Sequence, residues 1–267
     1  MTLSMGKAWE EAAAFLAREG RLVAPVALAL FALPSALLNW AYPAGSVTAA
    51  GGANSLALLL VLLVMMAGQM TIVILATGWH GSIGEALGKA ARRVPTLLLA
   101  AVVIFGPLLI IFSIALAAAL MAAGISDPAT VTPETLAKVP GVAWLILLMM
   151  VVLLVLGVRM FPMSAVAATE QVGPIAVLKR SWRLTRGQFW RLLALLLLLV
   201  VAALVLSYAV SVVVGSAATL ALGEPRPFNV PALIIALAGG FVSALISSVS
   251  AAMVARIYAQ LADQPAS

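Results

Sequence analysis

The side chains in this sequence that could do chemistry are mainly cations, and they gather in one stretch past the middle of the chain. Arg159 lies within a long apolar run, and four further cations follow it: Lys179, Arg180, Arg183 and Arg186. Clustered Lys and Arg beside a membrane segment attract anionic headgroups, at about 1 kcal/mol for each charge near the surface. These five residues are therefore candidate ligands for an anion or a lipid headgroup.

The sequence lacks the residue sets that catalysis and metal binding use. It has no cysteine, which removes thiolate nucleophiles and Cys-ligated metals, and His80 is its only histidine. The nine acidic residues flank the apolar runs, and none forms a pair at metal-binding spacing. We therefore expect no enzyme activity, no cofactor and no metal.

The elements that must position these cations are membrane helices. Apolar residues make up 64% of the chain and charged residues 9%, against about 45–50% and about 25% in soluble domains. A spanning helix needs about 20 apolar residues. Six stretches qualify, and they predict an all-α, integral membrane six-helix bundle as a single domain over 1–267 with no soluble catalytic domain: Leu22–Trp40, Leu56–Trp79, Pro95–Ala123, Val142–Thr169, Phe189–Leu222 and Pro231–Tyr258. Glu10, Glu11 and Glu19 stand where a cleavable signal peptide would be apolar, so we expect the first span to be retained.

The positions of Lys and Arg predict how the chain is threaded. Setting aside Arg159, the loops after the first, third and fifth spans hold only Lys138 and Arg226, and the other twelve basic residues lie in the alternate segments. Because basic segments stay in the cytoplasm, this predicts a multi-pass protein of the bacterial inner membrane with both termini cytoplasmic. Topology and anionic lipid explain the positive charge, so we expect no nucleic-acid partner.

Three basic segments precede pairs of spans on the cytoplasmic side, at about 7–21, 82–94 and 174–187. Each places apolar residues on one helical face and charges on the other. Helices of this kind lie in the headgroup plane with the apolar face down. We therefore predict three amphipathic interfacial helices, which either only anchor the loops or, in the third copy, also gather anionic headgroups.

The third segment belongs to a longer motif. Its residues are Arg159, Pro162, Glu170, Gly173, Pro174, Lys179, Arg180, Ser181, Trp182, Leu184, Thr185, Gly187 and Trp190. This stretch resembles the glycerophosphoryl diester phosphodiesterase membrane-domain family. The resemblance implies an inner-membrane module that in some relatives precedes a soluble phosphodiesterase domain, whose catalytic histidines and metal-binding carboxylates are not present in this sequence.

Physical chemistry accounts for much of the motif. Gly173 and Pro174 are suited to end one helix and begin the next. Gly187 is suited to a helix C-cap. Trp182 and Trp190 are expected at interfacial depth, where amphipathic rings settle.

Arg159 is the residue least suited to its surroundings. In a helix continuous to Thr169 it would lie about 15 Å deep, where a charge costs about 2.5–3.5 kcal/mol. Pro162 predicts a kink that frees a backbone carbonyl. Arg159 then either snorkels or caps carbonyls, or it faces a polar cavity and holds an anion. Glu170 would lie about 16 Å away in a straight helix, too far for a direct ion pair.

The sixth span carries small residues at four-residue spacing: Gly239, Ser243, Ser247 and Ala251. Such a ridge lets another helix approach closely. We expect packing within the chain, with a homodimer seam as the alternative.

Two functions remain open. The first is a non-enzymatic membrane protein that binds anionic lipid or a membrane or cytoplasmic partner protein. The alternative is a small transporter or lipid flippase with a polar cavity at Arg159, because transporters keep ionisable residues and broken helices inside the membrane. An enzyme acting on lipid phosphodiesters is supported by the family name alone.

Overall fold

The computed structural model describes residues 4–43, 52–79, 81–125 and 131–262, and its regular elements are helices. His80 lies outside the described residues. Six helices in the described part of the chain are long and apolar enough to cross a membrane: Met5–Ala41, Leu56–Ala76, Ile83–Ala122, Val142–Thr169, Phe189–Leu222 and Val230–Ala262. The prediction of an all-α fold with six apolar spans is therefore confirmed, and the chain is a multi-pass membrane protein.

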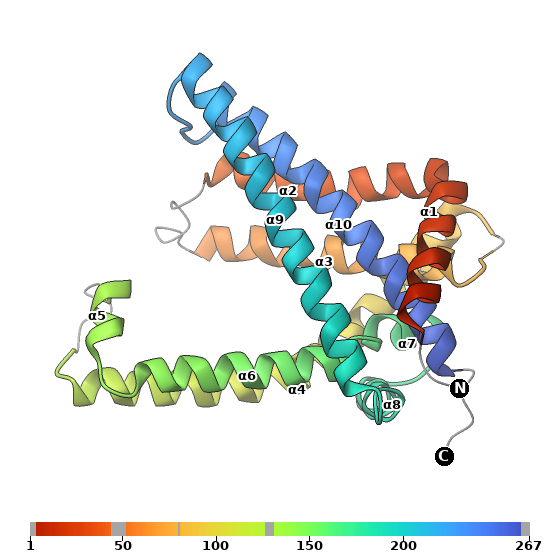
Figure 1. Ribbon diagram of the computed structural model, residues 1–267, viewed down its shortest axis with the longest axis horizontal. Coiled ribbons are helices and arrows are strands. Elements are labelled where there is room, and N and C mark those ends of the chain that lie inside the picture. Colours follow the sequence, from red (N-terminus) through yellow and green to blue (C-terminus); the bar gives the residue numbers. More distant parts are fainter. Residues whose placement is uncertain (1–3, 44–51, 80, 126–130, 263–267) are drawn as a thin grey trace.

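The first span is a continuous helix that contains a π-helical turn. It consists of α1 (Met5–Ala27), a π-helical turn η1 (Leu28–Ala32) and α2 (Leu33–Ala41). Pro34 has no N–H for the carbonyl of Leu30, and its ring would clash with that carbonyl. The turn is widened accordingly, and the N–H of Leu33 donates to the carbonyl of Leu28, five residues back. Figure 1 shows the chain changing direction between the first part of α1 and α2.

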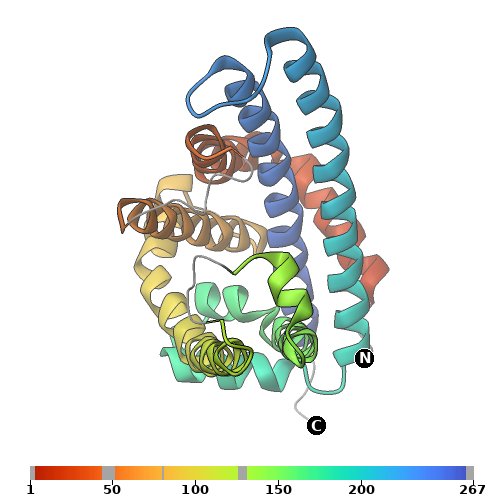
Figure 2. The same ribbon diagram turned by 90° about the vertical axis from the view of Figure 1, so that its left-hand side faces the viewer.

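The second amphipathic segment is the start of a long helix. After α3 (Gly52–Ala76), α4 runs over Ile83–Ala122. Its first turn is fixed by a capping box, in which Glu85 N–H donates to Ser82 Oγ and Ser82 N–H donates to Glu85 Oε2. Pro95 lies inside the helix and cannot donate to the preceding turn. Figure 2 shows α4 (yellow) bending between its first turns and its long apolar part.

The fourth span is broken where Pro162 predicts a kink. The short α5 (Pro133–Lys138) leads to α6 (Val142–Met160), which ends just before Pro162, and α7 (Met163–Thr169) follows. Gly173 and Pro174 then cap and open α8 (Pro174–Leu184), as the sequence predicts.

Of the three predicted amphipathic segments, only the third forms a helix of its own. Segment 7–21 lies within α1, and segment 82–94 forms the cap and the first turns of α4, so neither is a separate helix. The independent helix is α8, whose buried side includes Val177 and Ser181. Placement of these segments in the headgroup plane stays a prediction.

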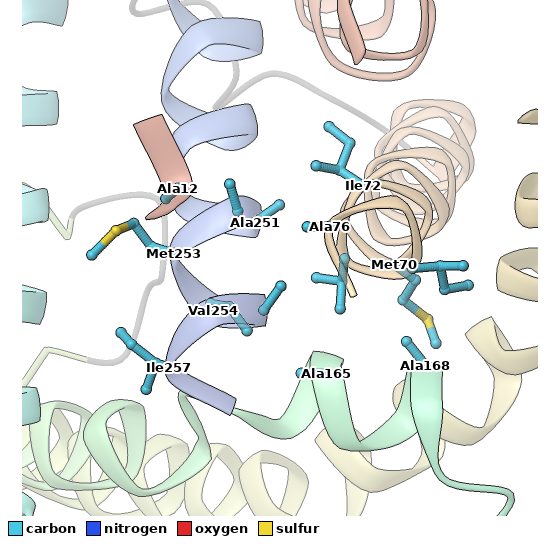
Figure 3. Packing of buried hydrophobic residues seen from close by; sticks show 14 of the residues in the cluster. Ala12, Met70, Ile72, Ala76, Ala165, Ala168, Ala251, Met253, Val254 and Ile257 are labelled. Atoms are coloured by element: carbon cyan, nitrogen blue, oxygen red, sulfur yellow. The ribbon is translucent and has the colours of Figure 1, made fainter. Parts of the chain in front are cut away.

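The core forms around the last helix. α9 (Phe189–Leu222) and α10 (Val230–Ala262) make a hairpin, and α10 also packs against α1, η1, α2, α3 and α7. Figure 3 shows Ala251 of α10 on the side that faces Ile72 and Ala76 of α3, and Met253 and Ile257 on the opposite side of α10. Small residues make this possible. A Cβ on Gly240 would lie 2.5 Å from the carbonyl oxygen of Ala32, so the backbones of α10 and η1 are in direct contact.

Burial is uneven along the helices. In α4 every buried residue lies between Ala86 and Ala100, and in α9 only Leu192, Leu195 and Ala218 are buried. Figure 1 shows the α4–α6 pair diverging from the α9–α10 pair. Large apolar side chains are exposed along these helices, which is the surface expected of segments surrounded by hydrocarbon.

Candidate anion-binding site at the basic end

The basic residues gather at one end of the molecule, which we call the basic end. It comprises α1 as far as Arg21, the first turns of α4 as far as Arg93, the segment from α8 to the first turn of α9, and the last turns of α10. Figure 1 places these segments toward the right. The α9–α10 connection and α5, which carry Arg226 and Lys138, lie toward the left and top.

Arg159 lies in the last turn of α6, between two aromatic rings. Its guanidinium carbon is 5.0 Å from the ring centroid of Trp182 in α8 and 5.6 Å from that of Phe189 in α9. Each such contact contributes on the order of 0.5–2 kcal/mol. Its Nη1 is buried and has no hydrogen-bond partner among the described residues. One donor of a stacked, charged side chain is thus free for an acceptor.

The structure changes the helix from which a depth of about 15 Å was predicted for Arg159, and the depth itself stays a prediction. That value assumed a helix continuous to Thr169, but α6 ends at Met160 and the chain turns at Pro162. Arg159 therefore lies beside α8 and the start of α9, which belong to the basic end.

Glu170 connects three elements through its carboxylate. Its Oε1 accepts hydrogen bonds from Arg180 Nε of α8 at 3.0 Å and from the Tyr258 hydroxyl of α10 at 2.9 Å. The pair with Arg180 is a half-buried ion pair. The sequence analysis missed this network because it follows from the break at 170–173, which turns α8 back toward Glu170. Arg180 is thus tied to the fold, and its charge is partly neutralised.

The other cations of α8 and of the turn after it can meet a ligand. Lys179, Arg183 and Arg186 are exposed, and none forms an ion pair with another described residue. The indole of Trp182 is 45% exposed and that of Trp190 is 78% exposed, so two large amphipathic rings flank these charges. Cations between exposed aromatic rings make a surface suited to a headgroup region.

Two further motif residues shape the link between α8 and α9. Ser181 is fully buried, and its hydroxyl has no partner among the described residues. Gly187 has a φ of +84°, which favours glycine. It lies two residues beyond the cap residue of α8, Thr185, so it shapes the turn into α9 rather than serving as the predicted C-cap.

The small-residue ridge on α10 divides between two environments. Ala251 is fully buried in the core, and Ser247 is half-buried. Gly239 is exposed, and Ser243 Oγ accepts a hydrogen bond from Ser35 Oγ of α2 at 3.1 Å. The closest backbone contact with η1 is made one position away, at Gly240.

In the described part of the chain, no three His, Asp or Glu side chains lie close enough together to hold a metal ion. At the basic end, the chemistry that the described cationic side chains support is recognition of an anion. The donors are guanidinium and ammonium groups, and the aromatic rings hold Arg159 in a fixed orientation.

Comparison with known proteins gives a family and no assigned role. No curated protein and no solved structure matches the chain. No link to the glycerophosphoryl diester phosphodiesterase membrane-domain family is found, so that resemblance depends on residues 159–191 alone. A family model described as a domain of unknown function, DUF7847, matches residues 3–261. The chain therefore belongs to the DUF7847 family.

Proposed function

We propose that this chain is a non-enzymatic protein of the bacterial cytoplasmic membrane that binds an anionic lipid headgroup at its basic end. Both termini lie in the cytoplasm in this proposal, because twelve of the fifteen basic residues belong to that end. The observation that carries the proposal is Arg159, a charged side chain stacked between two rings with one buried donor unpartnered.

The surroundings of Arg159 favour a lipid as the source of the anion. Trp182, one of its two ring partners, lies on α8, an amphipathic helix that carries Lys179 and Arg183 on its exposed surface. A helix with this pattern lies along the headgroups with its cations beside the phosphates. A phosphate oxygen that reached Nη1 would complete its hydrogen bonding, and such charged bonds contribute about 1.5–3 kcal/mol.

The test compares lipid retention by matched variants. In Arg159→Gln we expect phosphatidylglycerol bound in native mass spectrometry to fall about tenfold or more, because a charged hydrogen bond is lost. Arg18→Gln removes one exposed charge from α1 at the same end and serves as the control. Equal phosphatidylglycerol retention by Arg159→Gln and Arg18→Gln would remove the proposal.

A specific observation supports the second candidate, a transporter or flippase. A hollow of about 520 Å³ lies between α2, α9 and α10, away from the basic end. Its lining includes hydroxyl and amide side chains: Ser35, Asn39, Ser207, Ser211, Thr219 and Ser243. Polar groups inside a helix bundle, beside a first span whose helix widens at η1, are compatible with a transport pathway. Reconstituted protein that accelerates exchange of a fluorescent lipid between leaflets would favour this function, and an exchange rate equal to that of empty vesicles would count against it.

A further inference from the structure

A second cationic hollow lies at the basic end, on elements other than those around Arg159. It has a volume of about 840 Å³ and opens beside the first turns of α4. Its lining includes Gly84, Gly88, Lys89, Arg92 and Arg93, and Gln171 enters from the turn between α7 and α8. This volume is within the range of about 300–1,000 Å³ that small-molecule sites occupy.

The spacing of residues along α4 separates a packing face from a binding face. Ala86, Ala90 and Val94 are buried and hold the helix against its neighbours. Gly88 and Arg92, four residues apart, lie on the exposed side and line the hollow. Because residues three and four apart share a helical face, the cations project from one side into the same space.

The glycines keep this space open. A Cβ built on Gly84 or on Gly88 meets no atom within 4 Å, so the region above the helix surface is empty at both positions. The absence of side chains there leaves the surface of α4 open between the cations, so a ligand can approach it.

The charges around the hollow are not compensated from within the described protein. Lys89, Arg92 and Arg93 form no ion pair with another described residue. Glu85, the one carboxylate in the lining, is engaged in the capping box through its bond from Ser82 N–H. Lys89 Nζ is held 5.1 Å above the ring of Trp79, which positions its charge. Three cations face the hollow against one carboxylate that is already bonded.

We propose that this hollow binds a phosphate-bearing ligand. The phosphate would receive donors from Lys89, Arg92 and Arg93, and Gln171 adds a neutral amide from a second element. The group could belong to the headgroup of a membrane lipid or to a soluble phosphate ester, since both present the same anion. The site is formed by α4 and the turn after α7, so this inference is independent of the proposed site at Arg159.

The first experiment blocks the hollow without changing its charge. Gly88→Leu places a side chain into the open space, and Gly6→Leu is the matched control, since Gly6 is also an exposed helical glycine whose Cβ would meet nothing within 4 Å. Both variants should fold, because leucine is a better helix former than glycine. The probes are glycerol 3-phosphate added to protein in phosphatidylcholine nanodiscs, followed by calorimetry, and phosphatidylglycerol, followed by native mass spectrometry.

We expect Gly88→Leu to weaken binding of at least one probe by about tenfold or more through steric exclusion, with Gly6→Leu unchanged. Loss confined to glycerol 3-phosphate identifies a soluble ester, and loss confined to phosphatidylglycerol identifies a lipid. The proposal is overturned if wild type binds neither probe, or if Gly88→Leu binds both as wild type does.

The second experiment separates this site from general attraction to a basic surface. The triple variant Lys89→Gln, Arg92→Gln, Arg93→Gln should bind about 100-fold more weakly, at about fivefold for each charge. The control triple, which we call the α8 triple, is Lys179→Gln, Arg183→Gln, Arg186→Gln, and it removes equal charge from α8 and the turn that follows it. If the α8 triple abolishes binding and the α4 triple retains it, this inference fails and the proposed headgroup site on α8 is supported instead.

Discussion

Gly240 gives the sharpest test of the packing at the centre of the molecule. Replacing it with alanine puts a Cβ 2.5 Å from the carbonyl oxygen of Ala32 and 3.1 Å from the Cβ of Ala36. The first contact is with backbone, which cannot rotate away as a side chain can. Overpacking of this kind costs about 1–3 kcal/mol, and the gain in helix propensity from glycine to alanine offsets about 1 kcal/mol of that cost.

The neighbouring Gly239 is a matched control on the same helix. A Cβ at Gly239 meets nothing within 4 Å, so Gly239→Ala keeps the gain in propensity without the clash. We expect Gly240→Ala to be less stable than Gly239→Ala by about 1–3 kcal/mol. At about 2–4 °C for each kcal/mol, a scale taken from domains of 150–250 residues, the two unfolding midpoints should differ by several degrees.

The measurement is thermal unfolding of both variants in one detergent, followed by tryptophan fluorescence. Equal midpoints, or a higher midpoint for Gly240→Ala, would show that α10 and η1 are not in backbone contact. A disturbed η1 should also change the environment of Trp40 at the end of α2, whose Nε1 donates to the carbonyl of Asn229 at 3.0 Å.

Three further predictions, made with four single variants and one double variant, concern the basic end. Glu170→Gln weakens the half-buried ion pair with Arg180, and Tyr258→Phe removes one hydrogen bond to Glu170. Each variant should lower stability by about 0.5–1.5 kcal/mol in thermal unfolding. If the losses add in the double variant, the two bonds do not form a shared network. Ser82→Ala removes the cap of α4 and should lower the stability of the start of this helix by about 1 kcal/mol. Amide hydrogens in the first turn of α4 should then exchange faster with solvent, and an unchanged exchange rate there would contradict the capping role. Arg159→Lys keeps the charge but loses the planar fork, so phosphatidylglycerol retention in native mass spectrometry should fall between those of wild type and Arg159→Gln, and full retention would show that charge alone suffices.

The spans could be predicted from the sequence because hydrocarbon admits few solutions. A segment of about 20 apolar residues has to be helical there, since every backbone group must be bonded within the segment. The helix breaks at Pro162 and at Gly173–Pro174 could also be predicted, because proline lacks the backbone N–H that a helix needs as a hydrogen-bond donor. The sequence analysis started the first span at Leu22, but its helix begins at Met5. An amphipathic segment has the same periodicity whether it continues into a span or forms a separate helix, so the sequence could not distinguish the two.

The site was only partly predictable, for a geometric reason. The sequence singled out Arg159 and the cations of α8, but the stacking of Arg159 on Trp182 depends on how far the chain turns after Pro162. The bond from Arg180 to Glu170 depends on the later break at 170–173, which turns α8 back toward Glu170. Spacing along a helix cannot give such contacts once the helix ends. The hollow beside α4 likewise requires Gln171 to approach from another element.

The sparse burial beyond Ala100 in α4 has a consequence for handling the protein. In a membrane, acyl chains rather than neighbouring helices would surround most of this arm. The conformation of the α4–α6 arm should therefore depend on the lipid or detergent that surrounds it. Exchange into a short-chain detergent should loosen the α4–α6 arm first, while the helices wrapped around α10 keep their arrangement.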